Sequence, residues 1–298
     1  YSINYDIHDI DAYFLLVYIA AGMTGVFGIA KAVALVGEWR ANGWGRLRWV
    51  PFLLLPALQW WWNGTRVDES DNFLVHDYTR NILAGLDSNA VVLTYQWDYF
   101  VSASYYAQHV NKQRPDIVII DKELLRRSWY FIQVERNHPW LIERSSAKVG
   151  AFLRELSKFE HGLPYNGQVI EARYNEMIND MIDKSVEERP VYLGPEIEPQ
   201  FGPSFERVPE GLLLRLRKPG TGGSLREFYP FYRSTRFQSR LTRGLQTQYA
   251  QAFTYRAVWK MERGDLAGVR ELLERALSFD PGFLPALRLK ERLGSRNR

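Results

Sequence analysis

A long uncharged run lies near the start of the chain. Residues 12–30 contain no charged side chain, and apolar character continues past Lys31 to Val36. These 19 residues come close to the roughly 20 that a membrane-spanning helix needs. Soluble helices of this length usually carry a polar face, which this run lacks. The pattern therefore predicts a membrane span over residues 12–37. A long buried helix of a soluble protein is the alternative.

A second apolar run covers residues 49–62 and contains Pro51 and Pro56. The charge-free window 49–65 has 17 residues, which is the lower limit for a span. Three consecutive tryptophans close the run, as in the aromatic belts of membrane interfaces: Trp60, Trp61 and Trp62. We predict a second span, and a re-entrant or interfacial segment is the alternative.

The connection between the two runs, residues 38–48, carries three arginines: Arg40, Arg46 and Arg48. By the positive-inside rule this loop is cytoplasmic. Residues 1–11 and everything after Trp62 then lie on the extracytoplasmic side. We therefore predict an integral membrane protein whose soluble domain faces away from the cytoplasm.

The chain opens on Tyr1 with an acidic stretch, which is unlike the basic start of a signal peptide. We expect that it is processed or cut from a longer protein. The stretch holds Asp6, His8, Asp9 and Asp11. Such a cluster could bind a divalent metal. Negative charge also suits the N-terminal end of a membrane helix, and we favour this second interpretation. No metal site and no cofactor are predicted.

The rest of the chain alternates between strand and helix patterns. Residues 90–94 (AVVLT) and 116–120 (DIVII) are short, buried, β-branched runs, and 99–112 has helical length and spacing. Strand, helix and strand within about thirty residues predict a parallel βαβ unit. Further helices are predicted over 71–86, 145–160 and 168–184, a further strand over 189–194, and an edge strand over 211–217, where the alternation is only loose.

These elements predict a small three-layer α/β domain over residues 64–222, between membrane helices at 1–63 and a tail at 223–298. The turn after the first strand reads Tyr95-Gln96-Trp97-Asp98 and lacks a glycine-rich phosphate fingerprint. A nucleotide-binding Rossmann domain therefore loses its main support.

The C-terminal third carries the positive charge of the chain. From Phe205 onward there are 19 Lys and Arg against 9 Asp and Glu, whereas the rest of the chain has 19 against 25. Residues 225–244 interleave five arginines with aromatic residues: Arg226, Arg233, Arg236, Arg240 and Arg243. Such a segment can bind phosphate, sugars or headgroups. The alternative, which we favour, is a segment that packs domains together. No nucleic-acid partner is predicted.

The tail itself is predicted to be helical. Gly264-Asp265 begins a helix that Asp280-Pro281 ends, with Ala276 and Phe279 on it. This spacing is that of the second helix of a tetratricopeptide repeat, although the first-helix positions match poorly. We expect a single degenerate repeat or a cap of two to three helices, which could bind a protein partner.

The amino-acid composition excludes several kinds of site. Apolar residues make up 46% and charged residues 24%, as in an ordinary globular protein. There is no cysteine, which excludes disulfides, cysteine-ligated zinc, iron–sulfur clusters and cysteine nucleophiles.

Several short segments together resemble one family. They are Asp77-Tyr78 with Asn81-Ile82-Leu83, Asn89–Thr94, Trp97-Asp98, Tyr105–Gln108, Arg114-Pro115-Asp116, and Leu124-Leu125 with Trp129-Tyr130. The chain resembles, over about residues 1–220, the C-terminal half of polytopic membrane proteins related to the transmembrane-protein-260 type of protein O-mannosyltransferase. A tetratricopeptide-like tail is familiar in that family.

The resemblance implies a glycosyltransferase (hexosyltransferase) of the C type, which takes sugar from a polyprenyl-phosphate donor at the outer membrane face for a protein or glycan acceptor. The acidic catalytic motif of the family is expected in the first external loop of the full protein, which these residues do not contain. No catalytic residue is therefore assigned, and this portion is expected to bind an acceptor or partner. At the turn 95–98 many members carry a Gly-Asp-Asn-Asp-like sequence, of which only Asp98 is present.

The candidate substrate-binding residues follow the first two predicted strands, where open parallel sheets bind ligands. They are Trp97, Asp98, Asp121, Glu123 and Arg126, with Arg127 beside them. A carboxylate suits a sugar hydroxyl, and the tryptophan suits a sugar face. The alternative is that Asp98 and Asp121 only cap the helices that follow them.

Two other functions stay open. One is a non-catalytic, membrane-anchored scaffold whose helical tail recruits proteins, and the other is a free-standing enzyme that uses the Asp98 and Asp121 crevice.

Overall fold

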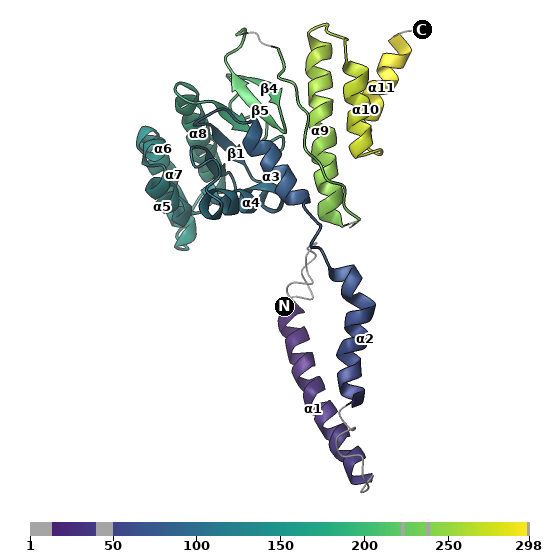
Figure 1. Cartoon of the computed structure of the whole chain (residues 1–298). Helices are drawn as coiled ribbons and strands as arrows, with labels where there is room; N and C mark the ends of the chain where they lie inside the picture. The colour runs from purple at the N-terminus through teal and green to yellow at the C-terminus, as the bar shows by residue number, and fades with distance from the viewer. Residues whose placement is uncertain (1–13, 40–49, 222–223, 237–238, 297–298) are drawn as a thin grey trace. The chain divides into compact units, whose positions relative to one another are not determined.

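The computed structural model describes residues 14–39, 50–221, 224–236 and 239–296 (Figure 1). The chain divides into two compact units, Tyr1–Asp71 and Asn72–Arg298. Two of the sequence predictions concern residues outside the described ranges. These are the acidic cluster from Asp6 to Asp11 and the arginine-bearing connection between the two apolar runs.

The first unit contains α1 (Leu15–Trp39) and α2 (Val50–Val67), so both apolar runs are helical as predicted. Within the described residues, α1 is the one helix long and apolar enough to cross a membrane, over Leu15–Ala32. Its apolar side chains are open to the surroundings, with Leu16 78% and Phe27 73% exposed. Helix α2 has Pro56 in its interior and does not reach the same hydropathy. A second span therefore stays a prediction.

The second unit is built on a mixed sheet. The strands that the structure describes are β1 (Val91–Thr94), β2 (Val118–Asp121), β3 (Val191–Leu193), β4 (Glu206–Glu210) and β5 (Leu213–Arg217). Their order is β2-β1-β3-β5-β4. Strands β2, β1 and β3 are parallel, whereas β5 runs antiparallel to both β3 and β4.

Helical segments connect these strands. Before β1 lies α3 (Leu74–Gly85), and between β1 and β2 lie η4 (Trp97–Val101), α4 (Ser102–Tyr105) and η5 (Tyr106–Val110). Between β2 and β3 lie η6 (Leu124–Arg126), α5 (Ser128–Asn137), α6 (Pro139–Arg144), α7 (Ser146–Glu160) and α8 (Gly167–Val186). After the sheet come α9 (Arg240–Glu262), α10 (Val269–Phe279) and α11 (Leu284–Arg296).

Both faces of the sheet are covered by helices, which explains why the central strands are apolar at every position. Val91 and Leu93 belong to one hydrophobic cluster with Tyr174 and other residues of α5 to α8. Val92, on the opposite face, belongs to a second cluster with residues of α3 and with Tyr249 of α9. Successive residues of β1 therefore pack into two different hydrophobic cores, one on each face of the sheet.

The predicted strands over 90–94, 116–120, 189–194 and 211–217 are confirmed as β1, β2, β3 and β5. The edge position expected for 211–217 is wrong, because β5 pairs with β3 on one side and with β4 on the other. Strand β4 and the helices α5 and α6 were not predicted. The sequence of β4 is Glu-Arg-Val-Pro-Glu, which does not look like a strand. It lies at the end of the sheet and pairs with β5 alone. An edge strand tolerates proline and charge because one of its sides needs no partner.

Residues 224–236, here called the linking segment, lie against the α/β unit. The side chain of Arg233 donates to the buried Asp77 at 2.5 and 2.9 Å, and Arg226 contacts Asp87 at 2.7 Å. Asn81 exchanges hydrogen bonds with the backbone of Phe231. These arginines are therefore engaged by acids of the same chain, as the domain-packing interpretation predicts.

The tail is helical, as predicted, and its helices share a core of small and apolar residues. Figure 1 shows α9 and α10 side by side, and Ala257, Leu273 and Ala276 lie buried between them. Ala286 brings α11 into the same cluster. Helix α9 also contributes to the core under the sheet. The tail is thus continuous with the α/β unit through α9.

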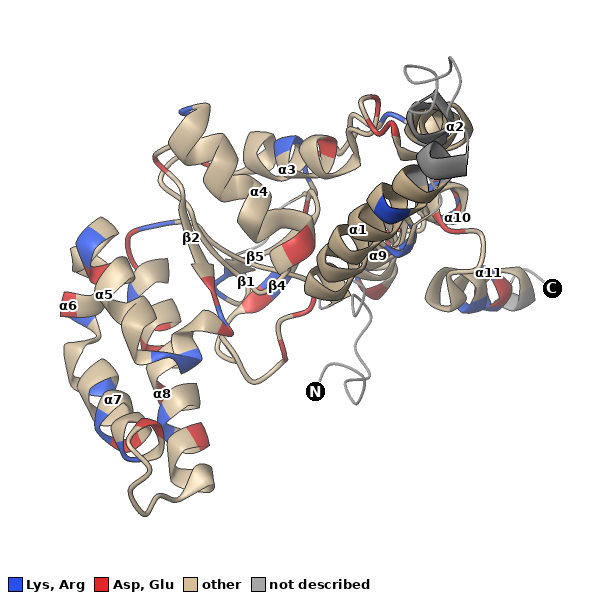
Figure 2. Cartoon of the chain, turned by 90° about the horizontal axis from the view of Figure 1, so that it is seen from below, with Lys and Arg blue, Asp and Glu red and all other residues tan. Residues whose placement is uncertain are grey.

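Basic and acidic side chains are interspersed on α5 to α8 (Figure 2). Lys148 pairs with Glu176 at 3.1 Å, and Lys184 pairs with Asp180 at 2.8 Å. Such exposed pairs add little stability, but the mixture leaves these helices without a large field of one sign.

Candidate functional site at the carboxyl edge of the sheet

The three parallel strands end at the same edge of the sheet, as Thr94 of β1 lies opposite Asp121 of β2 and Leu193 of β3 follows on the other side. The chain leaves β1 onto one face of the sheet and reaches β3 from the other. Between such strands an open α/β sheet normally leaves a crevice for a ligand. The carboxyl ends of β1 and β3 are therefore where a sheet of this topology would hold a ligand.

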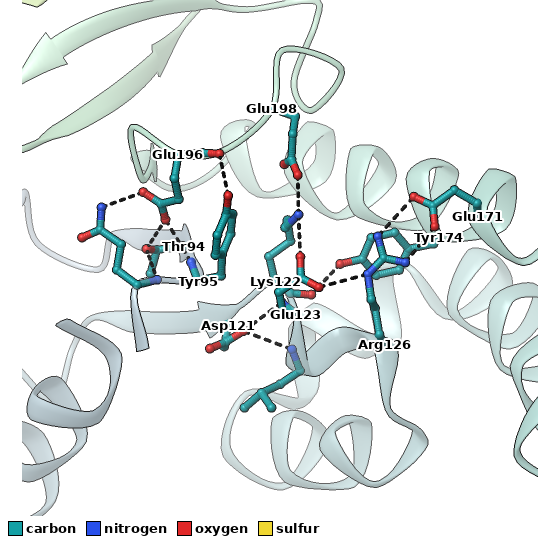
Figure 3. Close-up of polar contacts among 12 residues, drawn as sticks. Thr94, Tyr95, Asp121, Lys122, Glu123, Arg126, Glu171, Tyr174, Glu196 and Glu198 are labelled. Carbon is teal, nitrogen blue, oxygen red and sulfur yellow. Dashed lines mark hydrogen bonds and ion pairs between the residues drawn. The ribbon is translucent and has the colours of Figure 1, made fainter. Parts of the chain in front are cut away.

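The carboxylate of Glu196 occupies this position (Figure 3). Its Oε1 accepts hydrogen bonds from Thr94 Oγ1 at 2.5 Å and from the Tyr95 N–H at 2.9 Å, and its Oε2 accepts from Gln96 Nε2 at 2.7 Å. A Cβ atom at Gly194 would clash with the same carboxylate. The protein thus places its own anion where related architectures bind an anionic ligand.

Gln96 extends this contact to the helices above it. Its Oε1 accepts from the Tyr78 hydroxyl at 2.9 Å, and its Nε2 also donates to Gln248 Oε1 at 3.1 Å. One side chain therefore joins Glu196 to both α3 and α9. We conclude that this part of the carboxyl edge has a structural role, because it fixes α3 and α9 to the sheet.

Lys122 is the centre of a second group of contacts. Its side chain is 2% exposed, and Nζ lies 2.7 Å from both Glu123 Oε1 and Glu198 Oε1. The ammonium also lies 4.7 Å from the centre of the Tyr95 ring. Burial opposes the charged form, but the hydrogen bonds to the two glutamates outweigh burial and raise the pKa of Lys122. The lysine is therefore a fixed cation between two carboxylates.

Glu198 completes this ion group. Burial would raise its pKa, but the hydrogen bond from Lys122 lowers the pKa below the ordinary value, so Glu198 is ionised at neutral pH. Its second oxygen, Oε2, is buried and has no hydrogen-bond partner among the described residues.

Asp121 acts as the cap of a turn. Its Oδ1 accepts from the backbone N–H groups of Glu123 at 2.8 Å and Leu124 at 3.0 Å, where η6 begins. The residue is 3% exposed, and burial raises the pKa of its carboxyl group. This geometry matches the capping alternative.

Arg126 is also engaged. It makes a two-point contact with Glu171 at 2.7 and 3.1 Å, a third contact with Glu123 at 3.2 Å, and stacks 4.0 Å from the centre of the Tyr174 ring. Bidentate arginine–carboxylate pairs are among the stronger ionic contacts in proteins. The Arg126 side chain is thus held by the α8 helix.

Trp97 and Asp98 lie apart from these contacts. Trp97 is 46% exposed and meets the Tyr105 ring edge-on at 6.3 Å. Asp98 is exposed, and within the described residues its side chain makes no hydrogen bond or ion pair. It stands inside the first turn of η4, which is not capped by a side chain. The capping interpretation is therefore wrong for Asp98. Arg127 is exposed as well.

The structure thus brings Asp121, Glu123 and Arg126 together, and leaves Trp97 and Asp98 open to solvent. Sequence reasoning missed Lys122, Glu171, Glu196 and Glu198. A signal for two of them was present, because Glu196 and Glu198 follow the third predicted strand just as the chosen acids follow the first two. Among the described residues, no group of three or more metal-binding side chains converges.

The chain has distant relatives among known proteins. No protein-family model and no solved structure matches the chain. Curated proteins do match, and two of them are protein O-mannosyl-transferases. Protein O-mannosyl-transferase TMEM260 of Mus musculus is 27% identical over 98 residues, 33% of this chain and 14% of that protein. Protein O-mannosyl-transferase tmem260 of Dictyostelium discoideum is 23% identical over 205 residues, 65% of this chain and 22% of that protein.

The matched region spans less than a quarter of the length of either relative. Over that region, this chain is a distant relative of the protein O-mannosyl-transferases TMEM260.

Proposed function

We propose that the chain forms part of a membrane glycosyltransferase-like protein, and that its α/β unit binds an acceptor or a partner without itself catalysing transfer. The distant relatives and the apolar helix α1 support the first half of the proposal. By analogy with the relatives, the donor is a polyprenyl-phosphate sugar, the transferred sugar is mannose and the acceptor is a protein. The unit then lies on the extracytoplasmic side.

One observation carries the accessory role: apart from Asp98, the acids at the carboxyl edge are engaged by the chain itself. A catalytic base must reach the acceptor hydroxyl with a free carboxylate. The Asp121 carboxylate is turned onto backbone N–H groups, and Glu196 is held by β1. Glu123 and Glu198 both contact Lys122. Asp98 is free, but among the described residues no cation or polar side chain contacts it.

The helical tail supports a second candidate function, that of a scaffold. Helices α9 to α11 share a small-residue core, as helices of repeat proteins do. We infer a single degenerate tetratricopeptide-like repeat here, and such a unit suits a protein partner. In this case the partner binds at the tail and the α/β unit only supports it.

The first test is a transfer assay with the whole chain in detergent. Polyprenyl-phosphate mannose and a serine- and threonine-rich peptide are supplied, and mannosyl peptide is measured by mass spectrometry. We expect binding of the peptide without transfer, because no free base contacts a second functional group at the carboxyl edge. An active protein O-mannosyltransferase in the same assay is the positive control.

Mannosyl transfer by the chain that is lost in Asp98→Asn would overturn the accessory role. It would assign catalysis to the carboxyl edge instead. Absence of peptide binding would remove the acceptor-binding half of the proposal and leave the scaffold function.

A further inference from the structure

A cavity of about 350 Å³ lies beside β2, on the outer side of the sheet. Its walls come from the helical segment before β2, from β2 and from α5. Its lining includes Tyr105, His109, Ile119, Tyr130, Arg136 and His138. This volume is within the range of small-ligand sites, roughly 300–1,000 Å³. None of the carboxyl-edge ion pairs belongs to its lining.

The floor of the cavity is the free edge of β2. Val118 and Lys122 donate their N–H groups to β1, so the groups of Ile117, Ile119 and Asp121 face outward. The Ile117 carbonyl accepts from Gln108 at 2.8 Å, and the Asp121 N–H donates to the Tyr130 hydroxyl at 3.1 Å.

Both ends of the free edge are therefore closed by side chains of the protein. Between them, within the described residues, the N–H and carbonyl of Ile119 have no protein partner, and the residue is 5% exposed. A buried backbone donor and acceptor normally find a partner. Because side chains close the slot at both ends, an added strand does not fit there, whereas a compact molecule does.

The rim of the cavity is polar and positive. Arg136 and Gln133 of α5 and His109 of η5 line it, and within the described residues their side chains have no hydrogen bond or ion pair. No aspartate or glutamate is among the lining residues. Burial and the nearby Arg189 lower the pKa of His138 at the same rim, so this imidazole is neutral at pH 7 and Arg136 supplies the positive charge. The site therefore favours a ligand with negative charge.

Aromatic rings stand at one end of the cavity. The hydroxyls of Tyr105 and Tyr130 lie 3.4 Å apart in its wall. Each tyrosine meets an exposed tryptophan edge-on: Trp97, 46% exposed, and Trp129, 53% exposed. The two tyrosines line the cavity, and their rings and hydroxyls beside backbone amide groups suit a ligand ring that has an apolar face and a border of hydroxyls.

We propose that this cavity binds a sugar residue that carries an anionic group, such as a sugar phosphate. In this proposal Arg136 contacts the anionic group, and Gln133 and the backbone of Ile119 form hydrogen bonds with the hydroxyl groups of the sugar. This inference rests on the proposed function, since it names the ligand class of the binding domain. The site lies on the outer side of β2, apart from the acids that were predicted from the sequence.

The test is a titration of the whole chain in detergent with mannose 6-phosphate, mannose and inorganic phosphate in turn. Affinity is measured by calorimetry, and the imidazole signals are followed by NMR. We expect mannose 6-phosphate to bind more tightly than either of the others and to shift the signals of His109 and His138. The signal of His161, whose Nδ1 contacts Ser157, serves as the internal reference.

Arg136→Gln should weaken binding of mannose 6-phosphate about tenfold, because it removes a charged hydrogen-bond donor. Arg154→Gln, which changes an exposed arginine of α7 outside the cavity, is the matched control and should bind like the unaltered chain. Both positions are exposed, so unfolding midpoints should stay unchanged.

Three results would each overturn the proposal: no binding of mannose 6-phosphate, equal binding of inorganic phosphate, or unaltered affinity in Arg136→Gln. The transfer assay measures peptide binding and mannosyl transfer, whereas this titration measures binding of a small sugar phosphate and its dependence on Arg136. A failure of the cavity proposal is thus distinguishable from a failure of the proposed function.

Discussion

Two aspartates that occupy similar places in the sequence have different roles. Asp121 ends β2, and the chain turns at once into η6, so its carboxylate meets two free N–H groups. After β1 the helical turn starts from Gln96, whose carbonyl accepts from Phe100 and Val101. Asp98 therefore falls inside the turn with its side chain in solvent. A difference of a few residues in where a turn begins decides which acid becomes a cap.

Asn and Ala substitutions separate these roles. Asp121→Ala should lower the free energy of unfolding by about 1 kcal/mol, because a cap is lost. Asp121→Asn keeps an acceptor oxygen without a buried charge and should be at least as stable as the unaltered chain at pH 7. Both substitutions of Asp98 should stay within about 0.5 kcal/mol. Denaturant unfolding measures all four.

The pH dependence has a definite sign. The pKa of Asp121 is raised, so the folded state holds its proton more tightly than the unfolded state. Its contribution to stability therefore falls as pH rises through the carboxyl range. Asp121→Asn should abolish this part of the pH profile. Equal destabilisation by Asn and Ala would contradict the capping role.

At the scale of elements, the linking segment shows how a polar contact can hold two parts of the fold together. Asp77 on α3 is fully buried, whereas the Arg233 side chain is 39% exposed. Burial would raise the pKa of Asp77, but hydrogen bonds from Arg233 and His76 lower it. The carboxylate is therefore charged inside the protein and depends on the arginine.

Loss of the arginine should cost more than the loss of an ordinary surface charge. Arg233→Ala should lower the free energy of unfolding at pH 7 by clearly more than the control substitution, because a buried carboxylate loses its cation. Arg243→Ala, an exposed arginine on α9, is the control and should change stability by less than about 0.5 kcal/mol.

Acid should reduce the effect of Arg233→Ala. Because the pKa of Asp77 is lowered on folding, the stability from this pair is present above the ordinary carboxyl pKa of about 4. It is lost as pH falls through the lowered pKa. Urea unfolding at pH 7 and at pH 3 measures both values. The same penalty at both pH values would refute the ionic origin.

At the scale of the whole molecule, the two units differ in where their apolar groups lie. The described hydrophobic clusters all belong to residues from Leu74 onward, and they fill both faces of the sheet. The apolar side chains of α1 are exposed instead. Exposed apolar area of this extent needs a nonaqueous environment or a partner.

We therefore expect the whole chain to stay with membranes after an alkaline wash and to need detergent for extraction. A chain that begins at Asn72 should stay in the aqueous fraction, because the described cores lie beyond that point. Immunoblots of pellet and supernatant measure the distribution. Recovery of the whole chain in the aqueous fraction without detergent would show that residues 12–37 are no membrane span.

The sequence alone determined the positions of most elements. Strands β1, β2 and β3 are buried on both faces. A strand buried on both faces has consecutive apolar residues, and such a short apolar run can be recognised in the sequence. Most of helix α1 belongs to the charge-free run 12–30, and an apolar run of that length predicts a helix. Strand β4 stayed hidden because an edge strand satisfies only one side, which leaves room for proline and charge.

Only the tertiary structure decided the partners. Lys122 and Glu198 are 76 residues apart, Gln96 and Glu196 are 100 apart, and Asp77 and Arg233 are 156 apart. These contacts form because β3 lies beside β1 and because the linking segment packs against α3. A local sequence pattern predicts neither arrangement. The cavity beside β2 has the same origin, because its walls come from η5 and α5, which meet only when β2 takes the edge of the sheet.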